Sequence, residues 1–133
     1  MPENKFKVLV VDDEPEILDL LRYNFTKKGL EVSVALNGEA ALEVIENNIP
    51  QVIVLDIMMP VMNGIELCRK LRTNDKYKNI PILFLSATND DILILSAMDS
   101  GGDHFVSKPI RLSLLFEMVN DLHEEFKQKG MVE

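Results

Sequence analysis

The sequence predicts an α/β domain in which helices cover both faces of a parallel sheet. Short apolar runs alternate five times with longer segments whose apolar residues recur at helical spacing. Such alternation of strand and helix requires right-handed crossovers, which give a parallel, doubly wound sheet. The runs 51–55 and 80–85 are apolar almost throughout, as expected of strands buried on both faces.

The first strand is predicted at Lys7–Val11, and a helix follows it. Pro15 stands where the first turn of a helix tolerates proline, and apolar residues then recur at helical spacing from Ile17 to Phe25. Gly29 supplies a stop signal. This segment is therefore one complete strand–helix unit.

The second strand is predicted at Glu31–Ala35, where polar and apolar residues alternate. Period two suits a strand with one exposed face, so we expect it near a sheet edge. Asn37 can cap a helix over 38–48. The third strand, Gln51–Leu55, is followed by a loop and a helix over 65–72.

The last two units follow the same pattern. After the strand Ile80–Leu85, Asn89 or Asp90 can cap a helix over 92–100. The fifth strand is predicted at His104–Val106, and the last helix carries one apolar stripe. The residues of that stripe are Leu112, Leu115, Val119, Leu122 and Phe126. We expect His104 and His123 on the surface and the single cysteine, Cys68, in the core.

Length and charge restrict the class of protein. A chain of 133 residues is the usual size of one domain, so residues 1–133 are expected to form a single core. The net charge of −8 argues against direct binding of nucleic acid. One cysteine cannot form an internal disulfide, and no signal segment precedes the first strand, which favours the cytoplasm. No apolar run approaches the ~20 residues of a membrane helix.

Polar residues capable of joint chemistry follow four of the predicted strands: Asp12 and Asp13, Asp56, Ser86, and Lys108. In a doubly wound sheet, the carboxyl ends of the strands form the site. Close carboxylates repel by on the order of 4 kcal/mol per pair at an effective dielectric near 20, so cations must neutralise them. Lys108 can supply one charge and a divalent cation the remainder. Oxygen ligands favour Mg²⁺, or Mn²⁺, over zinc.

This set of groups is suited to accepting a phosphoryl group. An aspartate can act as the nucleophile and form an acyl phosphate, while a metal ion and a lysine neutralise the phosphoryl oxygens. A hydroxyl such as that of Ser86 can donate a hydrogen bond to the same group.

Four stretches of the chain resemble the receiver domain of two-component response regulators. They are "VLVVDDEP", "VIVLDIMMPVMNG", "PILFLSA" and "SGGDHFVSKP", in the order and spacing of that family. The resemblance covers about residues 5–127, which we take as the core of the domain. It implies a flavodoxin-like (βα)₅ fold with the strand order 2-1-3-4-5.

The resemblance also implies the role of each site residue. Asp56 would be the phosphoacceptor, and Asp13, Asp56 and the backbone carbonyl of Met58 would bind Mg²⁺ directly. Asp12 would act on the metal through water. Lys108 would contact the phosphoryl group, with Ser86 as the switch hydroxyl and Phe105 as the switch aromatic residue.

Simpler interpretations apply to some of these residues. The acids after the first strand could merely complement a helix dipole, worth about 0.3–1 kcal/mol per charge, and Glu14 is expected to serve that helix start. Met58, Met59 and Met62 are expected to pack in the loop rather than to bind copper. The combination of Asp56, Lys108 and Ser86 on matching strand ends favours the site.

The expected partners are a histidine kinase or a histidine phosphotransfer protein, and a downstream protein target or a second copy of the chain. We expect the output surface on the helix after the fourth strand, the fifth strand and the last helix. Four consecutive aliphatic residues, 92–95, spread around the whole helix, so at least one must point outward. The candidates for this surface are Leu93, Ile94, Leu114 and Met118.

Three other functions compete with this interpretation. A Mg²⁺-dependent phosphohydrolase with an aspartate nucleophile typically has a second aspartate two residues later, but Met58 occupies that position. A pseudo-receiver would lack acids or the lysine, and none is missing. An N-terminal receiver excised from a multidomain transcriptional regulator is the third. We expect a stand-alone receiver, which turns over no external substrate and is phosphorylated and dephosphorylated only on itself.

Overall fold

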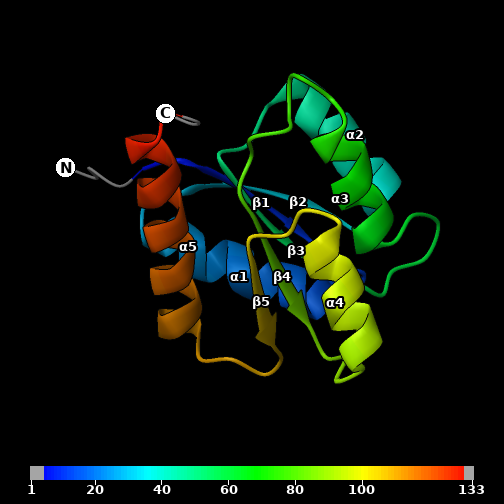
Figure 1. Ribbon diagram of the computed structural model, residues 1–133. Helices are drawn as coiled ribbons and strands as arrows, with labels where there is room; N and C mark the ends of the chain where they lie inside the picture. Colours follow the sequence, from blue (N-terminus) through cyan, green and yellow to red (C-terminus); the bar gives the residue numbers. More distant parts are fainter. Residues whose placement is uncertain (1–4, 131–133) are drawn as a thin grey trace.

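The computed structural model describes residues 5–130 and contains a five-stranded parallel sheet in the order β2-β1-β3-β4-β5 (Figure 1). The strands are β1 (Lys7–Val11), β2 (Glu31–Ala35), β3 (Val52–Leu55), β4 (Ile82–Ser86) and β5 (His104–Ser107). The helices are α1 (Pro15–Lys27), α2 (Gly38–Asn47), α3 (Gly64–Arg72), α4 (Asp91–Asp99) and α5 (Leu112–Gln128). The doubly wound fold and its strand order are confirmed, with β2 at one edge.

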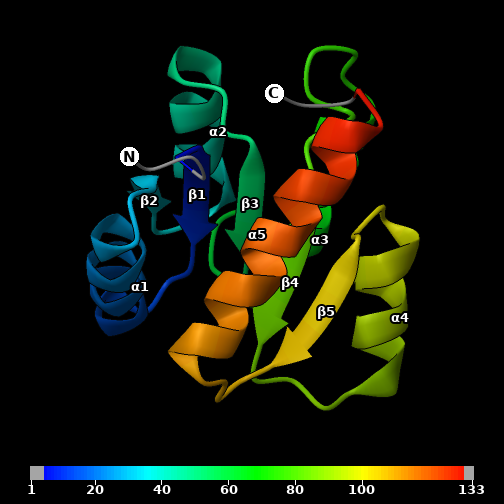
Figure 2. The ribbon, with the colours of Figure 1, turned by 90° about the vertical axis from the view of Figure 1, so that its left-hand side faces the viewer.

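The helices form two layers, one on each face of the sheet (Figure 2). Residues of α1 and α5 pack on one face against Val8 and Val10 of β1. Residues of α2, α3 and α4 pack on the other face against Leu9 and Val11. Successive residues of a strand point to opposite faces, so the apolar run of β1 contributes to both cores.

The boundaries of β1 and β2 are those predicted, whereas those of β3, β4 and β5 differ by one or two residues. β4 begins at Ile82 rather than at Ile80. Pro81 has no N–H to donate to the sheet, although its carbonyl accepts the N–H of Ile53 at 2.9 Å. At the other end of the fold, α5 continues through Gln128, two residues beyond the end of its predicted stripe.

The structure corrects the expected orientation of α4. Ile92 and Leu95 are the exposed aliphatic residues, at 77% and 69%, whereas Leu93 and Ile94 are half-buried. Leu93 packs against the core beneath α2, α3 and α4. The four aliphatic residues are consecutive, so their pattern could not indicate which of them face solvent.

The prediction that His123 lies on the surface is wrong. Its side chain is buried, and its ring stacks on that of Phe6 with 4.0 Å between the ring centroids. His123 follows Val119 by four residues, so it lies on the buried face of α5. His104 is exposed and Cys68 is buried, as predicted.

No helix within residues 5–130 is long and apolar enough to cross a membrane.

Arg72, the last residue of α3, connects three segments through its guanidinium group. Its Nε donates to the carbonyl of Gly101 at 2.9 Å, and its Nη1 donates to the carbonyl of Ile80 at 2.7 Å. Its Nη2 donates to Asp103 at 3.0 Å, and the same carboxylate oxygen accepts the N–H of Ile82 at 2.8 Å. The arginine thereby fastens the start of β4 to the turn before β5.

Substitution of Arg72 is expected to destabilise the domain. Arg72→Ala leaves three carbonyls, those of Lys78, Ile80 and Gly101, without a charged donor and should lower the free energy of unfolding by about 2–4 kcal/mol. Arg72→Lys should restore less than half of that loss, because an ammonium group lacks the planar fork. Urea denaturation measures both, with Arg69→Ala, an exposed residue of the same helix turn, as control. Equal stability of Arg72→Ala and Arg69→Ala would contradict this role.

Candidate functional site

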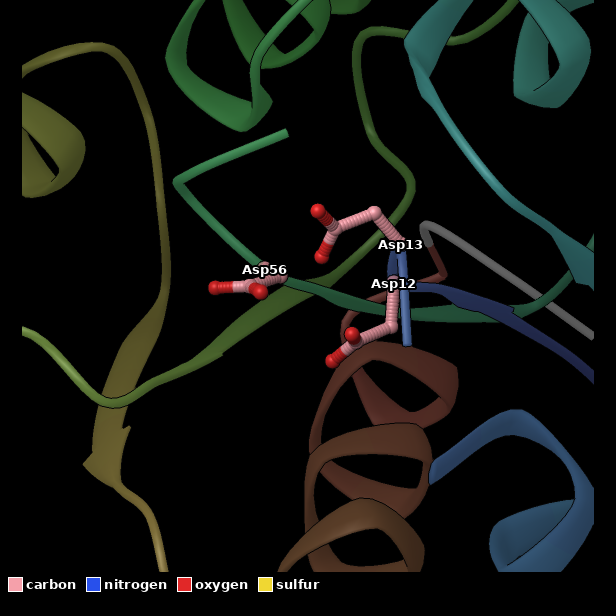
Figure 3. Close-up of side chains that lie close together, drawn as sticks. All are labelled: Asp12, Asp13 and Asp56. Atoms are coloured by element: carbon pink, nitrogen blue, oxygen red, sulfur yellow. The ribbon is translucent and has the colours of Figure 1, made fainter. Parts of the chain in front are cut away.

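The register of the sheet brings the predicted acids together. Val11 pairs with Leu55, so Asp12 and Asp56 follow neighbouring positions on adjacent strands. The N–H of Asp56 donates to the carbonyl of Val11 at 3.0 Å. Carboxylate oxygens of Asp12, Asp13 and Asp56 all lie within 4.8 Å of one another, at the carboxyl end of the sheet (Figure 3).

Lys108 reaches this cluster from the end of β5. Its Nζ lies 2.8 Å from Asp12 Oδ2 and 3.4 Å from Asp56 Oδ2. The same ammonium group lies 3.8 Å from the carboxylate of Glu14. Lys108 therefore supplies one of the positive charges that the close carboxylates require. The peptide bond from Lys108 to Pro109 is cis.

Glu14 stands at the N-cap of α1, as predicted, but its side chain does not cap the helix. Its backbone carbonyl accepts the N–H groups of Ile17 and Leu18 at 3.0 and 3.3 Å. Its carboxylate instead lies beside Lys108. The sequence offered no signal for this contact, because proximity to Lys108 depends on the path of the loop after β5.

Asp12 and Asp13 differ in what their carboxylates bind. One oxygen of Asp12 accepts the N–H of Glu14 at 2.9 Å, and the other accepts Lys108. Asp13 is exposed, and its carboxylate accepts no hydrogen bond from residues 5–130. Asp13 thus has free oxygens to offer an ion, whereas both oxygens of Asp12 are already engaged.

Burial and charge act in opposite directions on this cluster. Burial raises the pKa of Asp12, and this effect exceeds the lowering by the Lys108 and Glu14 hydrogen bonds. For Lys108, burial alone would lower the pKa, but the hydrogen bond to Asp12 and the charges of Asp56 and Asp12 outweigh it and raise the pKa. Lys108 is therefore charged at neutral pH.

The cluster opens into a surface cavity of about 390 Å³. Asp13, Asp56, Met58, Ser86 and Lys108 contribute to its lining, so the polar strand ends do share one space. The cavity is also lined by residues that the strand-end rule did not indicate, namely Glu14, Ala87, Thr88, Asp90 and Leu93. Several of these follow Ser86 directly in the chain, and that adjacency is the signal that could have identified them.

Phe105 does not line this cavity. Its side chain is half-buried and packs against the core beneath α2, α3 and α4. Phe105 pairs with Phe84 in the sheet, and the pair Ser86 and Ser107 lies two residues further along the same strands. Ser86 itself is 1% exposed, so only a small part of it reaches the cavity.

The loop after Asp56 returns close to the strand it leaves. Gly64 begins α3 so near to the carbonyl oxygen of Asp56 that an added Cβ would lie 2.0 Å from it. Only glycine fits there. Between them, Val61 has a φ of 69°, and the N–H of Met62 donates to the carbonyl of Pro60 at 2.8 Å. This tight turn fixes the backbone on one side of Asp56.

The oxygen atoms of the acidic cluster fit a hard divalent cation. Three carboxylates converge here, and histidine and cysteine are absent from the cavity lining and the cluster. Mg²⁺ prefers such oxygen ligands and retains several water molecules. The donor set thus agrees with the ion expected from the sequence.

Comparison with known proteins decides the family. The profile of the response regulator receiver domain matches residues 8–120. The chain belongs to the response regulator receiver domain family. This is a signalling domain of two-component systems rather than a metabolic enzyme.

Relatives of this receiver domain include transcriptional regulators. It is 41% identical over 103 residues to the alkaline phosphatase synthesis transcriptional regulatory protein PhoP of Bacillus subtilis, covering 77% of this chain and 42% of PhoP. It is 36% identical over 104 residues to AfsQ1 of Streptomyces coelicolor, covering 78% of this chain and 45% of AfsQ1. The chain thus spans less than half the length of these curated relatives.

Solved receiver domains have the same fold. The receiver domain of the Francisella response regulator 1452 superposes with a TM-score of 0.82 at 35% identity, over 90% of this chain and 98% of that one.

The raised pKa of Asp12 predicts a pH-dependent effect on stability. A carboxyl whose folded pKa lies above its ordinary value of 3.8 favours folding in acid, and this contribution is lost as pH rises through the folded pKa. Asp12→Asn should therefore stabilise the metal-free protein at pH 7 by on the order of 1 kcal/mol. The gain should shrink as pH falls toward 4.

Urea denaturation in EDTA, from pH 7.5 to 4.5, measures this difference. Asp75→Asn, which neutralises a fully exposed carboxylate, is the control and should show no such trend. A destabilised Asp12→Asn protein at pH 7, or a difference that does not vary with pH, would contradict the prediction.

Proposed function

We propose that Asp56 accepts a phosphoryl group and that this modification controls partner binding. The observation that carries the proposal is the position of the Asp56 carboxylate. It is 6% exposed, opens into the cavity and lies 3.4 Å from the ammonium group of Lys108. A buried carboxylate beside one fixed cation, with a hydroxyl in the same cavity, suits a phosphoacceptor.

In the proposed reaction, a carboxylate oxygen of Asp56 attacks phosphorus. A P–O bond forms while the P–N bond of a donor phosphohistidine breaks, and the departing imidazole nitrogen takes up a proton. Lys108 is positioned to neutralise charge on the phosphoryl oxygens, since it already lies between Asp12 and Asp56. The donor would be a histidine kinase or a histidine phosphotransfer protein.

We assign the metal ligands as Asp13, Asp56 and the backbone carbonyl of Met58, with Asp12 acting through water. The free carboxylate of Asp13 supports its place as a direct ligand, whereas both oxygens of Asp12 and of Asp56 already accept hydrogen bonds. Mg²⁺, when bound, supplies positive charge that offsets the negative charge of the phosphoryl group. Mn²⁺ has the same preference for oxygen ligands.

Ser86 and Phe105 form the proposed switch. Ser86 is nearly buried at the end of β4 and lines the cavity, so its hydroxyl can turn toward a new acceptor on Asp56. Phe105 lies on the neighbouring strand and is half-buried, which leaves it room to turn inward. Phenylalanine has no hydroxyl, so its contribution would be packing and not a hydrogen bond.

The proposed output surface consists of α4, β5 and α5. Its most exposed apolar residues are Ile92 and Leu95, and Leu114 on α5 is 41% exposed. Leu93, Ile94 and Met118, which the sequence also suggested, are half-buried at this surface. Exposed apolar residues on one surface are typical of a protein interaction site. The partner would be a downstream protein or a second copy of the chain.

The relatives bear on the size of the whole regulator. PhoP and AfsQ1 are named transcriptional regulators, and the matches cover less than half of each. They therefore support the alternative in which this receiver precedes an output domain. The phosphorylation chemistry proposed for Asp56 is the same in a stand-alone receiver and in a longer regulator.

Phosphorylation of Asp56 can be tested with acetyl phosphate. In the presence of Mg²⁺, the wild-type protein should gain one phosphoryl group, which is stable in acid and labile in base. Asp56→Asn should gain none, because an amide is not a nucleophile here, and omission of Mg²⁺ should greatly reduce labelling. Intact-mass spectrometry measures each result, with Asp75→Asn as a control that should label normally. Equal labelling of wild type and Asp56→Asn would contradict the assignment of Asp56 as the phosphoacceptor.

The output surface can be tested by placing charge on α4. Ile92→Lys and Leu95→Lys should each weaken phosphorylation-dependent partner binding or dimerisation by at least tenfold, because a charge would be buried in an apolar interface. Sedimentation velocity with and without acetyl phosphate measures dimerisation, and titration calorimetry measures binding to the cognate partner. Leu20→Lys on α1, where Leu20 is 48% exposed, is the matched control. Unchanged dimerisation and partner binding in both α4 variants would rule out this surface.

A further inference from the structure

Asp90 caps α4 with its side chain. One carboxylate oxygen accepts the N–H of Ile92 at 2.9 Å and lies 3.5 Å from the N–H of Leu93. The backbone N–H of Asp90 in turn donates to the hydroxyl of Thr88 at 3.1 Å. The first turn of α4 is therefore held by one negatively charged group.

The same residue lines the cavity that contains Asp56. The charged residues of the lining are four acids, Asp13, Glu14, Asp56 and Asp90, and one base, Lys108. Asp12 adds a further acid, but it is paired directly with Lys108. The cavity is thus acidic before any phosphoryl group arrives, and Asp90 faces it from the side of α4.

Few apolar contacts hold α4 on the sheet. The structure describes all nine residues of α4, and Ala97 is the one buried apolar residue among these nine. Ile92 and Leu95 are 77% and 69% exposed, and Leu93 is half-buried against the core. A cap is worth about 1 kcal/mol, which is a larger share of the stability of a helix when that helix buries little apolar area.

We propose that Asp90 is a positioning residue that couples phosphorylation of Asp56 to the release of the first turn of α4. This inference rests on the proposed function of Asp56. An acyl phosphate carries about one more negative charge than the carboxylate it replaces. The added charge repels the Asp90 carboxylate across the cavity and weakens its hydrogen bonds to Ile92 and Leu93. The start of the output helix is thereby loosened by the chemistry at Asp56.

Coupling of this kind acts in both directions. If a phosphoryl group on Asp56 weakens the Asp90 cap, the charge of Asp90 must disfavour attachment of that group to Asp56 by the same factor. Unit charges that line one partly screened cavity give an effect of about three- to tenfold. Because Asp90 is exposed, the effect must also decrease as salt is added.

The decisive variant is Asp90→Asn, because asparagine caps a helix as well as aspartate but carries no charge. Beryllofluoride serves as the probe, since it forms a tetrahedral, negatively charged adduct on a carboxylate. Mg²⁺ is held at the same saturating concentration before and after the addition, so that the adduct alone changes the charge of the site. Hydrogen exchange of the Ile92 and Leu93 amides, followed by NMR, reports the cap. Asp91→Asn is the control, because Asp91 is an exposed acid in the same helix turn that does not line the cavity.

In wild type and Asp91→Asn, binding of beryllofluoride should speed hydrogen exchange of the Ile92 and Leu93 amides by about three- to tenfold at low salt. The effect should be smaller in 0.5 M NaCl. In Asp90→Asn the change should be below about twofold, and beryllofluoride should bind about three- to tenfold more tightly. Asp90→Ala, which has no cap, should exchange rapidly at these amides before loading and show little further change. This set of results would not arise if Asp90 served only to hold the fold.

Two results separate this inference from the proposed function. If beryllofluoride forms no adduct at Asp56 in the wild type, the proposed function and the coupling both fail. If the adduct forms but exchange at Ile92 and Leu93 is unchanged, the coupling alone fails. An equal response in Asp90→Asn and wild type, or an equal gain in affinity in Asp91→Asn, also overturns it.

Discussion

The register between β1 and β3 fixes where the acidic residues of this domain meet. Because the strands are parallel and Val11 lies opposite Leu55, the next residue of each strand is an aspartate at the same edge of the sheet. Both residues are also buried there. Lys108 therefore offsets part of the negative charge that this register brings together.

The rest of the structure consists of a firmly packed sheet and one helix, α4, that buries little apolar area. The central strands are buried on both faces, and Arg72 ties α3 to the start of β4 and to the turn before β5. In contrast, α4 has one buried apolar residue and begins at the rim of the cavity. A local change of charge at Asp56 can therefore shift α4 while the sheet keeps the acids in place.

The sequence was sufficient for the fold class and for most of the site, for identifiable reasons. Strand and helix alternate clearly, and Asp12, Asp56 and Lys108 each follow a strand while Ser86 ends one, so a parallel sheet gathers them at one edge. The strand order came from the resemblance to receiver domains, because periodicity does not say which strands are neighbours. The orientation of α4 could not be predicted, since four consecutive aliphatic residues leave no apolar face to identify.

Other contacts depended on loop paths and local packing. The contact of Glu14 with Lys108 requires the path of the loop after β5. The burial of His123 required a partner, Phe6, that lies more than a hundred residues away in the chain. Such details become visible only once the sheet has brought distant segments together.

The acidity of the cavity explains why one site can both bind a cation and respond to an anion. Carboxylates in excess over Lys108 attract a divalent ion, but the same excess opposes any group that brings further negative charge. In the proposed coupling, part of that opposition falls on Asp90, the lining acid that caps α4. Asp12 is tied to Lys108 and to the backbone of Glu14, whereas Asp90 is exposed and bonded to the first turn of a loosely packed helix. Under the proposed coupling, charge added at Asp56 would therefore act on α4, where the exposed apolar residues Ile92 and Leu95 lie.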